Sequence, residues 1–147
     1  MKQIIYLLIC CLLGANIAKA QTYARIKVDQ VTVKAADQQL TGSGVIIPLQ
    51  LRDKTDAVTL FSNSDLTITV RYKLIDMKSG RSDNKASGIR FKIDYTCTYK
   101  GKTQRRSVER MFFINDKRVF DEKDAFVFNN KISNTKIAFS YTGMLEE

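Results

Sequence analysis

LTITVRYKL at residues 66–74 and IRFKIDYTCTY at residues 89–99 decide the fold of this chain. In both stretches, large apolar side chains alternate with polar or charged ones. A period of two is typical of a β-strand that buries one face and leaves the other in solvent. Residues 77–87 (MKSGRSDNKAS) lie between the two stretches and are mostly small or charged, which favours an exposed loop between hairpin strands.

Weaker strand patterns flank this central pair. Apolar residues occupy every second position of residues 45–51, and Pro48 on the other face indicates an edge strand, because proline has no N–H group to donate. Residues 26–33 change parity in the middle, so we expect a β-bulge near Asp29 and Gln30 that turns the apolar residues on both sides of it toward the core. Further strands are expected at residues 58–61, 108–114, 125–128 and 136–141, with turn-forming residues between them.

These segments amount to seven to nine short strands, and no window of helical length has a 3.6-residue period with helix caps. The pattern predicts an all-β fold. We expect an antiparallel β-sandwich of the immunoglobulin-like or jelly-roll-like kind, with a small barrel as the alternative. The length of residues 21–147 fits a single domain with a core of its own.

Residues 1–20 have the three parts of a cleavable secretory signal peptide. Lys2 makes a positive start, residues 4–17 form an apolar run, and Ala18-Lys19-Ala20 offers small residues at the −3 and −1 positions of a peptidase site. The run is shorter than the roughly 20 apolar residues that span a bilayer, and no second run follows, so no permanent membrane span is expected.

Cysteine usage indicates the compartment. Cys10 and Cys11 leave with the signal peptide, and lipid attachment at either is the less favoured alternative, because neither follows the small residue that precedes a lipid-modified cysteine. Cys97 remains, in an apolar series that predicts a packed and inert thiol. An exported domain without a disulfide or an N-glycosylation sequon is typical of bacteria, so we expect a periplasmic or extracellular bacterial protein.

Charge and residue types restrict the chemistry. Loss of Lys2 and Lys19 leaves 22 basic residues against 15 acidic ones, a net charge of +7 that favours polyanions and also aids solubility. The chain holds no histidine, which excludes histidine-based catalytic triads and imidazole zinc sites. Residues 121–124 are acidic but interleaved with basic ones, so we expect a solvated loop rather than an acid–base pair or a calcium site. No enzyme activity, metal or cofactor is predicted.

The surface feature most suggestive of binding is a group of cations at the solvent-facing positions of neighbouring strands. Its expected members are Arg71, Lys73, Arg90, Lys92, Arg105, Arg106 and Arg110. Arg106 and Arg110 depend on the turn after Tyr99: a two-residue turn at Lys100-Gly101 would place both on the core side, whereas a turn one residue longer would place them outside. We favour the longer turn, because two unpaired buried guanidinium groups would be costly.

Nucleic acid and sugar are disfavoured as ligands, because the strand aromatics follow the buried parity and the chain has no tryptophan for stacking. We therefore expect a non-enzymatic exported binding or assembly module of a bacterial cell envelope, acting through a sheet face or an edge strand. Its partner would be an envelope protein or an anionic polymer. The alternative is a soluble polyanion-binding protein that uses the basic face, and an enzyme with an unrecognised carboxylate site is the least favoured interpretation. The competing interpretation of the cations themselves is that they only solvate the strand faces and discourage aggregation at the edges.

Overall fold

The computed structural model describes residues 25–50, 55–78, 88–113, 119–129 and 134–146. The signal peptide predicted at residues 1–20 lies outside the described residues. Most of the predicted loop, residues 79–87, and Leu51 lie outside them as well.

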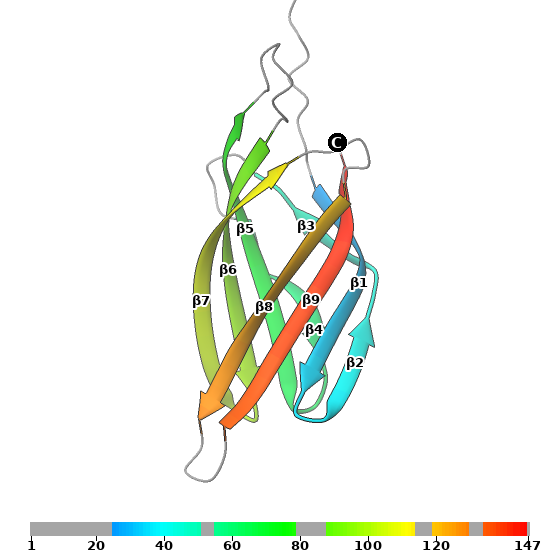
Figure 1. Cartoon of the computed structure of the whole chain (residues 1–147), viewed down its shortest axis with the longest axis vertical. Coiled ribbons are helices and arrows are strands. Elements are labelled where there is room, and N and C mark those ends of the chain that lie inside the picture. Colours follow the sequence, from blue (N-terminus) through cyan, green and yellow to red (C-terminus); the bar gives the residue numbers. More distant parts are fainter. Residues whose placement is uncertain (1–24, 51–54, 79–87, 114–118, 130–133, 147) are drawn as a thin grey trace, which may run out of the picture.

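The described residues form nine strands in two antiparallel sheets that pack face to face (Figure 1). The strands are β1 (Arg25–Ala35), β2 (Gln38–Gly42), β3 (Val45–Pro48), β4 (Val58–Ser62), β5 (Leu66–Lys78), β6 (Gly88–Tyr99), β7 (Lys102–Phe113), β8 (Val119–Asn129) and β9 (Asn134–Glu146). The five-stranded sheet has the order β2-β1-β9-β8 with β3 beside β1, and the four-stranded sheet has the order β4-β5-β6-β7. The predicted antiparallel β-sandwich is confirmed. Over the described residues the sheets do not join into the small barrel considered as the alternative.

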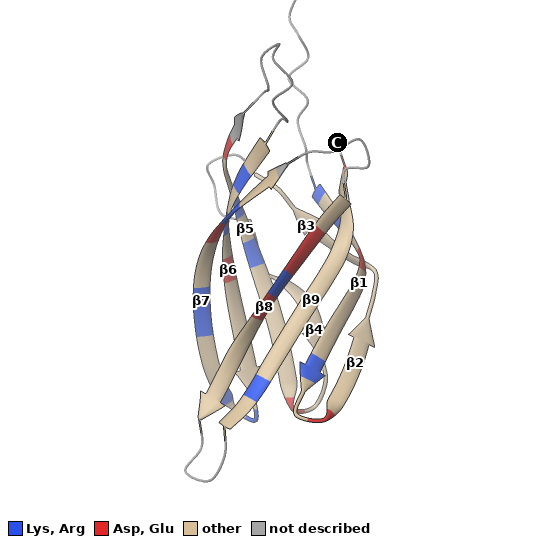
Figure 2. Ribbon diagram, viewed as in Figure 1, with Lys and Arg blue, Asp and Glu red and all other residues tan. Residues whose placement is uncertain are grey.

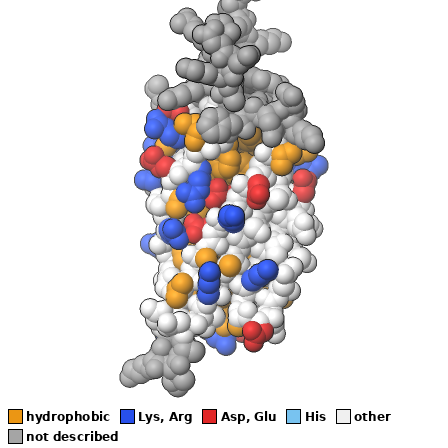
Figure 3. Space-filling model, viewed as in Figure 1, with side chains coloured by type: hydrophobic (Ala, Val, Ile, Leu, Met, Phe, Trp, Pro, Cys, Tyr) orange, Lys and Arg blue, Asp and Glu red, His pale blue; other side chains and the backbone are white. Residues whose placement is uncertain are grey.

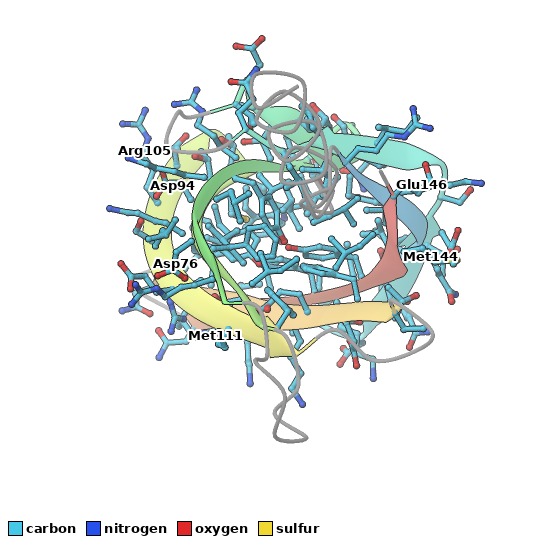
Figure 4. All side chains as sticks on the ribbon, turned by 90° about the horizontal axis from the view of Figure 1, so that it is seen from above. Asp76, Asp94, Arg105, Met111, Met144 and Glu146 are labelled. Atoms are coloured by element: carbon cyan, nitrogen blue, oxygen red, sulfur yellow. The ribbon has the colours of Figure 1, made fainter. Side chains whose placement is uncertain are left out.

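β5 and β6 form the predicted central hairpin. Their register pairs Val70 with Tyr95 and Leu74 with Phe91, so that the apolar residues of both strands share the inner face. They pack against apolar side chains of β1, β8 and β9 in one core, which fills the space between the sheets (Figure 4). The hairpin therefore supplies ten of the 24 buried hydrophobic residues among those described, and its polar side chains face solvent.

The predicted bulge in β1 is confirmed. The register of β1 against β9 shifts between Val28 and Gln30, and the apolar residues on both sides of the shift are fully buried. Gly143 lies opposite the bulge, where an added Cβ would overlap the carbonyl oxygen of Lys27 and lie 2.9 Å from the Cα of Val28. The bulge thus brings two backbones so close that only glycine fits. Pro48, in β3, also lies as predicted at the edge, since β3 pairs in its sheet with β1 alone.

The turn between β6 and β7 differs from our prediction. Tyr99 pairs with Lys102, so the turn has two residues, Lys100 and Gly101, with φ angles of 47° and 78°. Positive φ at both positions is the geometry of the tight hairpin turn that matches strand twist. Our preference for a longer turn is therefore wrong, and the register that follows places Arg106 and Arg110 on the inner side of β7.

Candidate functional site

Five of the seven predicted cations share the outer face of the four-stranded sheet. We call Arg71, Lys73, Arg90, Lys92 and Arg105 the outer basic face. The sheet brings them together because Lys73 of β5 pairs with Lys92 of β6, and the neighbouring outward positions carry the other three cations. Figure 2 shows these basic segments on β5, β6 and β7.

Carboxylates compensate much of this charge. Arg90 forms an ion pair with Asp76, with 2.5 Å between Nη2 and Oδ2. Glu109 is the cross-strand neighbour of Lys92, and Asp94 is the cross-strand neighbour of Arg71. The outer basic face is therefore a mixed surface with a modest positive excess.

A hollow of about 570 Å³ lies on this face, and we call it the outer hollow. Arg71 and Arg105 line it together with Asp94 and with the hydroxyl-bearing side chains Thr69, Thr96 and Ser107. The Ser107 hydroxyl donates to the Asp94 carboxylate. The Nε of Arg71 is shielded from solvent and has no hydrogen-bond partner among the described residues. Figure 4 shows Asp94 and Arg105 on the same outer side of the sandwich.

Arg106 and Arg110 lie at the junction between the two sheets, although Arg106 also lines the outer hollow. Arg106 pairs with Asp124 at 2.9 Å between Nη1 and Oδ1, and Arg110 pairs with Glu122 at 3.0 Å between Nε and Oε1. Gln104 adds a hydrogen bond from its Nε2 to the Val127 carbonyl oxygen at 2.9 Å, and we call this set of contacts the β7–β8 seam. Side chains thus bridge two strands that the sheets leave unpaired with one another.

The acidic partners were not predicted, because residues 121–124 were expected to form a solvated loop. They belong instead to β8, in which Glu122 and Asp124 share the inner face with Phe120, Phe126 and Phe128. That shared parity is the sequence signal that would have found them. The objection to two arginines on the inner side of β7 is also removed, since each guanidinium meets a carboxylate and the side chains stay 52% (Arg106) and 38% (Arg110) exposed. Inward-pointing charges at a sheet edge additionally discourage pairing with other chains.

Three buried tyrosines lie between the sheets, next to the seam. The hydroxyl oxygen of Tyr141 lies 2.6 Å from that of Tyr72 and 2.8 Å from that of Tyr95, so it bonds to both. Burial raises the pKa of all three phenols, and the nearby Glu122 carboxylate raises it further. The hydroxyls therefore stay protonated at neutral pH and connect the two sheets rather than take part in proton transfer.

Burial also governs the other titratable groups of the interior. It raises the pKa of Glu122, an effect that Arg110 opposes. It raises the pKa of the Cys97 thiol to about 12, so that the thiolate, the nucleophilic form, is not populated at neutral pH. Cys97 is fully buried, as its apolar series predicted.

A second hollow, of about 410 Å³, lies on the outer face of the five-stranded sheet. Three lysines line it, and they come from three strands: Lys34 of β1, Lys123 of β8 and Lys136 of β9. These lysines were not predicted as a group, because they are distant in the chain and meet only through the strand order β1-β9-β8.

No protein-family model, no curated protein and no solved structure matches this chain. In the described ranges, no three or more histidine, cysteine, aspartate or glutamate side chains come together as metal ligands. The described residues also include no helix that is long and apolar enough to cross a bilayer.

Proposed function

We propose that this protein is a non-enzymatic exported binding module of a bacterial cell envelope, and that it engages an acidic group of a partner protein through the outer hollow. The observation that carries this proposal is the arrangement of two guanidinium groups, Arg71 and Arg105, in one hollow with three hydroxyl-bearing side chains. Guanidinium groups donate in a planar fork that matches a carboxylate, and bonds between charged groups are stronger than neutral ones.

Arg71 is the residue that most favours a ligand. Its Nε is withdrawn from solvent and lacks a hydrogen-bond partner in the described part of the chain. Buried donors in folded proteins nearly always have an acceptor, so an acceptor supplied by a partner would complete this one.

The character of the hollow favours a protein partner over a uniform polyanion. Asp94 pairs in the register with Arg71 on one side and with Ser107 on the other, and it accepts from the Ser107 hydroxyl, so the hollow presents an acceptor as well as donors. Protein–protein interfaces typically combine hydrogen-bond donors and acceptors. A surface that binds a polyanion instead presents mainly cations, which contact the phosphates of the polymer. A soluble polyanion-binding protein remains the alternative, on the basis of the net charge.

Export and lack of catalysis rest on the chemistry of the residues. Residues 1–20 have the features of a signal peptide, and the chain contains no histidine. The thiol of Cys97 is buried, and Glu122 and Asp124 are engaged by arginines. The mass of the protein secreted from cells that express the full chain tests export: cleavage after Ala20 predicts a mature chain that begins at Gln21.

Two double variants test the binding site. R71Q/R105Q removes two charges from the outer hollow, and K34Q/K136Q removes two charges from the opposite sheet as a matched control. The probes are a short peptide of alternating glutamate and serine, and heparin, each titrated into the mature domain at two salt concentrations. We expect R71Q/R105Q to weaken peptide binding by about tenfold or more, and K34Q/K136Q to change it by less than about twofold.

The results separate the interpretations. Equal weakening by the two double variants would mean that net charge alone drives binding, and would overturn the proposed site. Tight heparin binding with a steep salt dependence, together with no measurable peptide binding, would favour the polyanion alternative.

A further inference from the structure

Exposed apolar side chains gather on the outer face of the five-stranded sheet. Of the five large hydrophobic side chains that are exposed among the described residues, four lie on this face: Ile46 (54% exposed), Val119 (51%), Val127 (47%) and Met144 (46%). Scattered exposed apolar residues are ordinary, whereas neighbouring ones that form a continuous strip mark an interaction surface.

Three of these side chains form a row across four strands. Ile46 of β3 pairs with Lys27 of β1, Lys27 pairs with Met144 of β9, and Met144 pairs with Val119 of β8. All of them occupy outward positions, because each has a buried neighbour along its strand: Ile47, Ile26, Leu145 and Phe120. We call Ile46, Met144 and Val119 the apolar row. Figure 4 shows Met144 on the opposite side of the sandwich from Asp94 and Arg105.

The second hollow, lined by Lys34, Lys123 and Lys136, lies on the same face, and we call it the lysine hollow. Its floor consists of small residues, since Ala138 of β9 lies between Lys34 of β1 and Ala125 of β8 in the register. Figure 3, which looks onto β8 and β9, shows basic side chains standing around small hydrophobic ones on the lower part of this face.

The three lysines are placed to converge on one group. Neighbouring strands are about 4.8 Å apart, and two residues along a strand span about 6.7 Å. These spacings and the register place the Cα atoms of Lys34 and Lys136 roughly 8 Å apart, and the Cα atom of Lys123 roughly 12–14 Å from both. No ion pair within the described residues involves any of the three. Asp124 also lines the hollow, but its carboxylate is on the inner side of β8, where it pairs with Arg106. Asp121, two positions from Lys123 on β8, forms no ion pair with that lysine in the described part of the chain.

We propose that this face docks on an anionic phospholipid layer, with a phosphate headgroup in the lysine hollow and the apolar row at the boundary of headgroups and acyl chains. Interfacial surfaces combine these two elements: apolar side chains enter the boundary while lysines reach the anionic headgroups. Lysine, a compact point charge, suits a phosphate without the planar match that arginine offers to a carboxylate.

The distance between the two features sets the orientation. Six residues of β9 separate Met144 from Ala138, about 20 Å along the strand. Contact at both ends requires the sheet to lie with its face parallel to the layer. Val127 pairs with Lys136 in the register and therefore supplies an apolar contact beside the lysine hollow as well. The opposite, four-stranded sheet then faces away from the layer and keeps the outer hollow accessible.

Sedimentation with vesicles tests this proposal on the mature domain. The vesicles are phosphatidylglycerol mixed with phosphatidylcholine, and phosphatidylcholine alone. We expect the domain to sediment with the mixed vesicles and not with phosphatidylcholine alone. Since each lysine near an anionic surface contributes about fivefold, we expect K34Q/K136Q to weaken partitioning by roughly 10- to 30-fold. The matched control R71Q/R105Q changes it by less than about threefold.

A second variant pair tests the apolar row. V119S/M144S keeps every charge and alters exposed positions, so circular dichroism and thermal unfolding are expected to match those of the parent domain. We expect this variant to partition less onto the mixed vesicles while binding inorganic phosphate unchanged. Equal losses from the two charge variants, an unchanged V119S/M144S, or phosphate binding without vesicle binding would each overturn the proposal. None of these results affects the test of the outer hollow, which uses a soluble peptide.

Discussion

Replacement of Arg110 by methionine would remove the cation that neutralises Glu122 and keep most of the stem that packs at the β7–β8 seam. Glu122 is 5% exposed, so the change leaves a carboxylate in the interior without its ionic partner. Removal of one member of a buried pair costs about 3–5 kcal/mol. The Arg110 side chain is 38% exposed, so solvent screens the ion pair and reduces this cost. We therefore expect a loss of about 2–3 kcal/mol in the free energy of unfolding at pH 7.

Replacement of Glu122 by glutamine is the matched change, because it keeps the shape and an acceptor oxygen for the Nε of Arg110. Burial raises the pKa of Glu122 in the folded protein, so the fold favours the neutral form of this group. E122Q is therefore expected to cost less than about 1 kcal/mol at pH 7. The double variant R110M/E122Q is expected to recover most of what R110M alone loses.

Urea unfolding of the mature domain at pH 7 and pH 5 measures these differences. A raised folded pKa means that ionisation of Glu122 opposes folding at neutral pH and that this opposition is relieved as the pH falls toward the unfolded value. The loss caused by R110M, taken relative to the parent at each pH, should therefore shrink at pH 5. The reasoning is refuted if E122Q costs as much as R110M, or if the R110M loss is the same at both pH values.

Three further predictions follow from the interior. Y141F removes the hydroxyl that bonds to two other buried tyrosines, and we expect a loss of about 2 kcal/mol or more in urea unfolding; a loss below about 0.5 kcal/mol would show that those bonds contribute little. G143A forces a Cβ onto the carbonyl oxygen of Lys27 and is expected to destabilise the domain by about 2–4 kcal/mol in thermal unfolding, so an unchanged Tm would contradict the close approach. Cys97 is expected to resist a thiol reagent at pH 8 in the folded mature domain and to react fully in urea, because burial raises its pKa to about 12; rapid labelling without denaturant would contradict its burial.

The central hairpin could be predicted from sequence because alternation is uninterrupted over residues 66–74 of β5 and 89–99 of β6, and one parity of both stretches is buried. The bulge could be predicted for a related reason. A change of parity between two apolar pairs has a simple solution when both must face one core, and the shift between Val28 and Gln30 provides it.

The turn after Tyr99 could not be predicted in the same way. The choice of register depended on whether Arg106 and Arg110 had partners in the interior, and those partners lie on β8, which was expected to begin only at residue 125. Lys100 also gives no sign of a positive φ, although Gly101 does. Because the start of β8 was predicted too late in the chain, the inner positions of Glu122 and Asp124 were missed. Arg106 and Arg110 were then predicted on the wrong side of β7.

The outer basic face could be predicted in part, since parity and one hairpin determine which side chains of β5 and β6 share a surface. The lysine hollow and the apolar row could not. The lysine hollow combines residues of β1, β8 and β9, and the apolar row also includes β3. Alternation along a strand does not reveal which strands lie beside it. Predictions of surfaces from sequence extend only as far as the strand order that can be inferred.

The proposal that this domain binds through the outer hollow is tested most directly by NMR chemical-shift mapping. The measurement titrates the acidic peptide into the isotopically labelled mature domain and follows every backbone amide. We expect saturable shifts centred on Thr69, Arg71, Thr96, Arg105 and Ser107, with the five-stranded sheet unaffected. Shifts spread evenly over lysines and arginines of both sheets, or centred on the lysine hollow, would contradict the proposal.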